Sequence, residues 1–200
     1  MNTVTKNSKK LRKLATTGIL CGVMLFLAFT DVAVISIPPA NMSFCCVPII
    51  VGTLLCGLDT GIILSLIFGI SSVVKAFTAP SVLVLPLMGV SPAYVIIMSV
   101  GARLLIPVFT HLVYKAFKKH KKAGTAVSSL AGAVTNTVFY LGLMLLFYTM
   151  AGLDSAAVLG VIAGVGALNG SLEAAAAVIV CTPVVIALQN AFSKKQVKEA

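Results

Sequence analysis

Residues 93–122 read AYVIIMSVGARLLIPVFTHLVYKAFKKHKK, an apolar run of twenty-five residues followed by a dense basic cluster. A helix needs roughly 20 apolar residues to cross the hydrocarbon core of a bilayer. Lys and Arg accumulate in loops on the cytoplasmic side of membrane proteins. The stretch therefore predicts a membrane-spanning helix over 93–117 that ends at the cytoplasmic surface.

The composition of the whole chain agrees with a bilayer environment. Of its 200 residues, 59% are hydrophobic and 10% are charged. Soluble domains carry about 25% charged residues, and disordered chains have low hydrophobicity. The chain also holds more apolar side chain than a soluble protein of this length could bury. We therefore expect an all-α integral membrane protein.

Apolar runs separated by turn-forming or charged residues predict six transmembrane helices in a single transmembrane domain, residues 1–200. The predicted spans are 14–35, 44–58, 60–77, 93–117, 125–150 and 170–191. The segment 76–92 contains three prolines and is expected to be a loop. The apolar stretch 155–192 is too long for one crossing, so we expect a short segment at 155–167 and a break within 164–170.

The basic residues predict how the spans are oriented. Thirteen of the fifteen Lys and Arg residues lie in three patches, 6–13, 115–122 and 194–198. Six crossings place all three patches on one side, so both termini are expected in the cytoplasm and residues 1–13 form a basic cytoplasmic tail. The long connections then lie outside. We therefore interpret the net charge of +10 as a signal for membrane orientation. The alternative, binding to nucleic acid, is not favoured, because the sequence offers no recognition helix and no basic segment with interspersed aromatic residues.

Motifs for common enzymatic chemistry are absent from the sequence. There is no G-x-x-x-x-G-K-[ST] loop for ATP and no G-x-S-x-G nucleophile motif. The five acidic residues are scattered, and the five cysteines lack metal-ligand spacing. We expect no enzyme activity, no cofactor and no metal site.

Ionisable residues inside predicted spans are the first candidates for a binding site, because such groups usually face a cavity or a partner. Arg103 lies twelve residues before Lys115, about 18 Å along a helix. By the same measure, Glu173, Lys75 and Asp31 fall in the outer half of the bundle. These residues predict a polar substrate pocket open to the outside. Two alternatives are an Arg103–Glu173 ion pair between helices and a Lys75 side chain that reaches the headgroups.

Three asparagines extend this candidate set. Asn136 lies inside a predicted span and needs a hydrogen-bond partner there. Asn169 lies at the expected helix break, where it could also cap the last span. Asn41, in the first outer connection, could equally be a turn residue.

Gly18 and Gly22 form a G-x-x-x-G pattern in the first span. Small residues at this spacing let helices approach closely. The pattern is compatible with packing inside the bundle and with docking of another membrane protein.

Several stretches resemble the substrate-binding S components of energy-coupling factor (ECF) vitamin transporters. FCCVPIIVG at 44–52, LLCGLDTG at 54–61 and LIFG at 66–69 are similar to their second and third helices. LNGSLEA at 168–174 and VCTPVV at 180–185 are similar to their sixth helix. The resemblance covers roughly residues 12–192 and is strongest to the pantothenate-type members.

The resemblance implies a bacterial plasma-membrane subunit that binds a vitamin on the outer side with high affinity. Its partners would be a membrane coupling protein, docked at Gly18 and Gly22, and two ATPase subunits that bind ATP in its place. Arg103 and Lys75 suit a carboxylate, and asparagines suit amides and hydroxyls, which favours pantothenate. The alternative is a self-sufficient six-helix secondary transporter of a small anionic solute.

Overall fold

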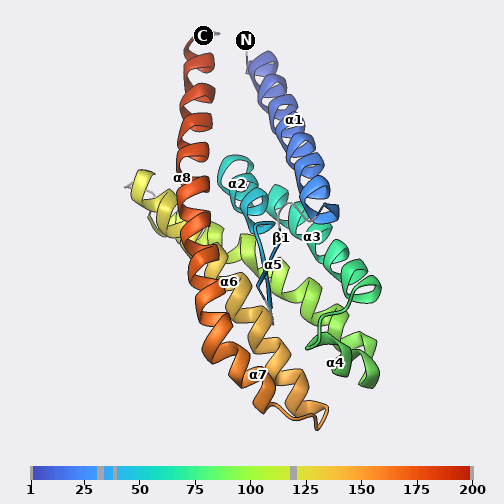
Figure 1. Cartoon of the computed structure of the whole chain (residues 1–200). Helices are drawn as coiled ribbons and strands as arrows, with labels where there is room; N and C mark the ends of the chain where they lie inside the picture. Colours follow the sequence, from blue (N-terminus) through green and yellow to red (C-terminus); the bar gives the residue numbers. More distant parts are fainter. Residues whose placement is uncertain (1, 31–33, 38–39, 118–120, 199–200) are drawn as a thin grey trace.

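The computed structural model describes residues 2–30, 34–37, 40–117 and 121–198, which form a helical bundle with one small hairpin (Figure 1). The helices are α1 (Asn2–Phe29), α2 (Cys46–Cys56), α3 (Leu58–Thr78), α4 (Val84–Val90), α5 (Pro92–Ala116), α6 (Lys121–Met150), α7 (Ala156–Val161) and α8 (Ala167–Lys198). A π-helical turn, η2 (Ile162–Gly166), joins α7 to α8. Strands β1 (Val34–Ile37) and β2 (Ala40–Ser43) pair antiparallel. The predicted helical class is confirmed.

Among the residues that the structure describes, five helices are long and apolar enough to cross a membrane. They cover Lys10–Phe29, Leu58–Thr78, Pro92–Ala116, Lys121–Met150 and Leu168–Phe192. The remaining predicted span, 44–58, corresponds to α2, which has 11 residues. At 1.5 Å per residue α2 is about 17 Å long, shorter than the hydrocarbon core of about 30 Å. Its side chains are mostly buried by neighbouring helices.

The first predicted span ends earlier than expected. Helix α1 ends at Phe29, and residues 34–37 form a strand instead of the last helical turn of the span. The β-branched residues Val34, Ile35 and Ile37 favour extended backbone, and two prolines follow them in the sequence. Helix α1 already begins at Asn2, so residues 2–13 of the predicted basic tail are helical.

The segment 76–92 contains a helix where a loop was predicted. Pro86 is the third residue of α4, and the first turn of a helix tolerates proline because its N–H groups have no partner within the helix. Leu87 is fully buried against a cluster that includes Val95, Met98 and Phe147. The Tyr148 hydroxyl donates a 2.6 Å hydrogen bond to the Leu83 carbonyl and fixes the start of this segment to α6.

The expected break at 164–170 is a π-helical turn that leaves the chain helical. Helix α8 begins at Ala167, directly after η2. Asn169 therefore lies inside α8, and the alternative in which it caps the last span does not hold. Because η2 runs into α8, no free helix end remains there to be capped.

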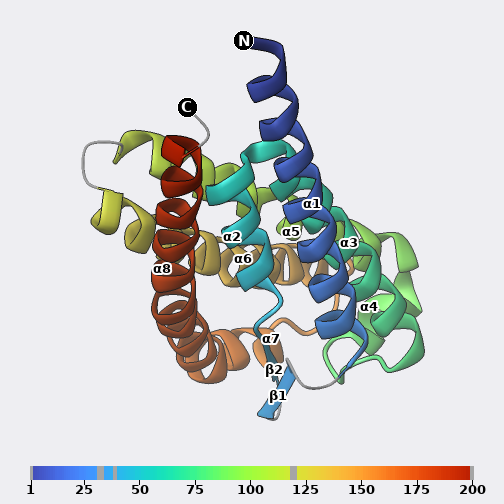
Figure 2. The same cartoon turned by 90° about the horizontal axis from the view of Figure 1, so that it is seen from above.

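Both chain ends lie at the same end of the molecule, and α2 lies between α1 and α8 in two perpendicular views (Figures 1 and 2). Packing is close where α2, α3 and α5 meet. A Cβ at Gly61 would collide with Thr53 Oγ1 and lie 2.6 Å from Cβ of Pro107. Glycine therefore lets α2, α3 and α5 approach one another closely.

Candidate functional site

A cavity of about 630 Å³ lies within the bundle. Its walls come from the end of α1, the second half of α3, residues 79–84, the first half of α5, the middle of α6 and the beginning of α8. Small-molecule sites in proteins have volumes of about 300–1,000 Å³. The cavity is therefore large enough for a metabolite.

Five of the six residues predicted for substrate binding line this one cavity. They come from α3, α5, α6 and α8 and are Lys75, Arg103, Asn136, Asn169 and Glu173. The sixth, Asn41, pairs with Ser36 in the hairpin, and its side chain lies outside the described part of the structure. The other early candidate, Asp31, lies outside the described residues altogether.

Arg103 is a buried cation held by aromatic rings. Its side chain is 8% exposed, and its guanidinium carbon lies 4.3 Å from the ring centre of Tyr140 and 5.0 Å from that of Phe68. Such cation–π contacts stabilise a desolvated guanidinium. Nε and Nη1 have no hydrogen-bond partner. Two strong donors thus remain unused in a residue that lines the cavity.

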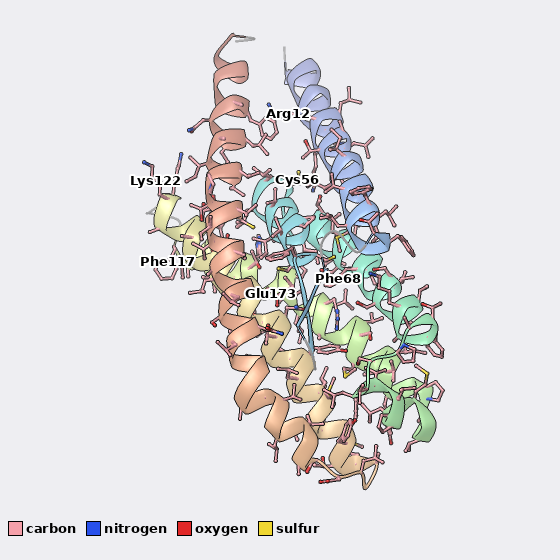
Figure 3. All side chains as sticks on the ribbon, in the orientation of Figure 1. Arg12, Cys56, Phe68, Phe117, Lys122 and Glu173 are labelled. Atoms are coloured by element: carbon pink, nitrogen blue, oxygen red, sulfur yellow. The ribbon has the colours of Figure 1, made fainter. Side chains whose placement is uncertain are left out.

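Glu173 is engaged by polar groups of α6. Its side chain is 6% exposed; Oε1 accepts a 3.1 Å hydrogen bond from Asn136 Nδ2, and Oε2 accepts a 3.2 Å bond from Thr137 Oγ1. Within the described residues, no carboxylate oxygen lies within 4.0 Å of Arg103. The structure therefore does not form the Arg103–Glu173 ion pair considered from the sequence. In Figure 3, the labelled residues Phe68 and Glu173 lie near the middle of the bundle's height, below Arg12 and Cys56.

Asn136 is buried, with 8% exposure. Its Nδ2 is used by Glu173, whereas its Oδ1 has no hydrogen-bond partner. Asn169 is equally buried. Lys75 lies in the last turn of α3, is half-buried and lines the cavity.

Sequence reasoning missed Phe68, Tyr140 and several small polar residues of the cavity wall. Phe68, Ser71, Ser72 and Lys75 all line it and follow the spacing i, i+3, i+4, i+7. Residues at that spacing share one face of a helix. A search for polar groups on the face of Lys75 would have found the serines, but nothing local indicated which rings lie against Arg103.

A second, smaller cavity of about 120 Å³ lies between α1, the end of α2 and α8. Its cations already have partners. Lys13 forms a 3.1 Å ion pair with Asp59, and Arg12 lies 4.5 Å from the ring centre of Phe192 and contacts its carbonyl. In the larger cavity, by contrast, Nε and Nη1 of Arg103 have no hydrogen-bond partner.

Gly18 and Gly22 lie on an open face of α1. A Cβ at either position would have no neighbouring atom within 4 Å. Only 11% of the residues in the apolar part of α1 are buried, against 44% for α5. Among the described helices, none packs against the G-x-x-x-G pattern.

Long apolar helices around a cavity that several polar side chains line indicate a multi-pass membrane protein. The family model for the substrate-specific component of ECF transporters matches residues 12–185. The chain therefore belongs to the ECF transporter substrate-specific component family, which is a family of transporter subunits and not of enzymes. Membership implies a small-molecule substrate and association with an ECF module of ATPases and a transmembrane component. No curated protein matches the chain in sequence.

Proposed function

We propose that the chain is the high-affinity substrate-binding subunit of an ECF-type ABC transporter for a water-soluble vitamin, and that this vitamin is pantothenate. The observation that carries the proposal is Arg103, a buried guanidinium that lines a cavity of about 630 Å³ and keeps two donors unpaired. A ligand carboxylate would neutralise this charge and accept from both donors, and charge-assisted hydrogen bonds of this kind are the strong ones.

Different polar residues of the cavity are proposed to bind different groups of pantothenate. Arg103 and Lys75 bind its carboxylate. Asn136 and Asn169 bind its amide and hydroxyl groups, together with Asn41 from the first outer connection. Glu173 completes the site and accepts hydrogen bonds from Asn136 and Thr137. The chain has no Trp, which argues against a site built on stacking of a flat aromatic ligand.

The proposed topology has six crossings, with α2 as the short second one and with both termini in the cytoplasm of a bacterial cell. Two features support it. Both chain ends lie at one end of the molecule (Figures 1 and 2), and the basic patches are located at 6–13, 115–122 and 194–198. Lys and Arg are retained on the cytoplasmic side. The cavity then opens toward the outside, and residues 1–200 form one transmembrane domain.

Energy for uptake is proposed to come from partner subunits. The chain has no phosphate-binding loop, so the two ATPases of the module bind ATP, and this subunit uses no cofactor of its own. The open face of α1 at Gly18 and Gly22 is the proposed contact with the membrane coupling protein, because glycine at this spacing admits a second helix at close range.

Titration of the purified chain with pantothenate in detergent tests the binding role. We expect saturable binding without any partner subunit. Proteoliposomes that contain the chain alone should not accumulate pantothenate, whereas those that also contain the ECF module and ATP should. Accumulation by the chain alone would favour the secondary-transporter alternative. No binding would contradict pantothenate as the ligand.

A further inference from the structure

The orientation of the Asn136 amide follows from its neighbour. Asn136 Nδ2 donates a 3.1 Å hydrogen bond to Glu173 Oε1, and an amide NH2 group is a donor only. Thr137 Oγ1 donates to the other carboxylate oxygen at 3.2 Å. Glu173 is thereby held between two consecutive residues of α6, and it holds the amide of Asn136 in one orientation.

The other half of this amide is an acceptor without a donor. Asn136 Oδ1 is buried and has no hydrogen-bond partner among the described residues. Buried polar side-chain atoms in proteins nearly always have a partner. Asn136 also lines the cavity, so a bound molecule is the natural source of the missing donor.

The unpaired groups of Arg103 have the opposite character. Its Nε and Nη1 are donors, and the rings of Phe68 and Tyr140 hold the guanidinium without neutralising it. The same cavity therefore presents a charged donor group from α5 and a fixed neutral acceptor from α6. A matching ligand has an anionic group and, separately, a hydroxyl or amide N–H.

We infer that Asn136 is a specificity-determining residue that accepts a hydrogen bond from a ligand hydroxyl or amide N–H, and that Glu173 is a positioning residue that orients this amide. The inference rests on the proposed binding function of the cavity. It assigns Glu173 a role through Asn136, in place of a direct contact with the ligand. A ligand analogue without this hydroxyl or N–H group would leave Asn136 Oδ1 unpaired. Binding sites that hydrogen-bond such a group discriminate strongly against analogues that lack it.

A double-mutant cycle with pantothenate as the probe tests the assignment. Asn136→Leu and Glu173→Leu should each weaken binding about tenfold or more, since each removes the oriented acceptor. The double variant should bind no more weakly than Asn136→Leu alone, because Glu173 acts only through the amide. Thr135→Val is the matched control. Thr135 is buried on the same helix but bonds to the Ala131 carbonyl and is not part of the cavity wall.

The conservative variant separates positioning from general structural support. In Glu173→Gln the new side-chain oxygen can still accept from Asn136 Nδ2, so affinity should return to within about threefold of the wild type. Losses that add in the double variant would show a direct ligand contact by Glu173 and overturn the inference. An affinity of Glu173→Gln as low as that of Glu173→Leu would do the same.

A measurement without ligand separates the test of the Asn136–Glu173 contact from the test of the vitamin proposal. Thermal unfolding of the ligand-free wild type, both single variants and the double variant should show coupling between Asn136 and Glu173. If wild-type protein does not bind pantothenate, the vitamin proposal fails and the unfolding cycle still decides the contact. Additive changes in melting temperature would overturn the inference for any ligand.

Discussion

At the scale of single residues, the two buried ionisable side chains of the cavity, Arg103 and Glu173, have different surroundings. Glu173 accepts side-chain hydrogen bonds, among them those from Asn136 and Thr137. Arg103 lies against two aromatic rings and keeps unpaired donors. An uncompensated buried charge is destabilising. Arg103 is therefore the residue whose environment improves most when an anion enters the cavity.

Replacement of Arg103 tests this reasoning. Arg103→Ala should weaken pantothenate binding at least about tenfold, or about 1.4 kcal/mol, with the fold retained. Arg103→Lys should fall between Ala and the wild type, because lysine keeps the charge but loses the planar group that stacks on the rings. Titration calorimetry measures both variants. Lys122→Ala, at an exposed position on α6, is the control. Unchanged affinity in Arg103→Ala would remove Arg103 from the site.

At the scale of elements, glycines serve two different purposes. Gly61 is required where α2, α3 and α5 meet, since even a Cβ would collide there. Gly18 and Gly22 face open space on α1, the least buried of the five long helices. The first arrangement is needed for packing within the chain. The second leaves a surface on which another membrane protein can dock.

Leucine at the open glycines should therefore separate binding from transport. Gly18→Leu and Gly22→Leu should leave pantothenate affinity unchanged and reduce ATP-dependent uptake in the reconstituted complex, because a bulky side chain keeps the partner helix at a distance. Gly142→Leu is a matched control, since Gly142 also faces open space but lies on α6. Uptake rates equal to the wild type would place the docking surface elsewhere.

At the scale of the whole molecule, the distribution of charge underlies the proposed orientation in the membrane. The basic patches surround the chain ends and the start of α6, whereas the segment before α4 carries an exposed Val82. Under the topology proposed above, the positive-inside rule predicts the first group in the cytoplasm and the second outside. This topology counts the short, largely buried α2 as the second crossing.

Cysteine labelling in intact cells tests the topology. A cysteine in Val82→Cys, where the native side chain is 77% exposed, should react with a membrane-impermeant maleimide. A cysteine in Lys122→Cys should react only after the cells are opened. The parent protein, which has five free cysteines, measures the background. Labelling of Lys122→Cys in intact cells would contradict a cytoplasmic position of the basic patch.

The sequence by itself determined the helical membrane class, the approximate positions of the long helices and a set of polar candidates. These features follow from local hydropathy and from the high cost of polar groups in lipid. Five of the six candidate substrate-binding residues line one cavity, although whether they bind a ligand stays a prediction.

Only the tertiary structure decided which groups became neighbours. It placed rings from α3 and α6 against Arg103 and directed Glu173 to Asn136 and Thr137. It also set the short length of α2, the helical form of α4 and the π-helical turn before α8. Hydropathy records how a segment partitions into the bilayer, but partners more than thirty residues apart are chosen by packing between helices, which no local pattern encodes.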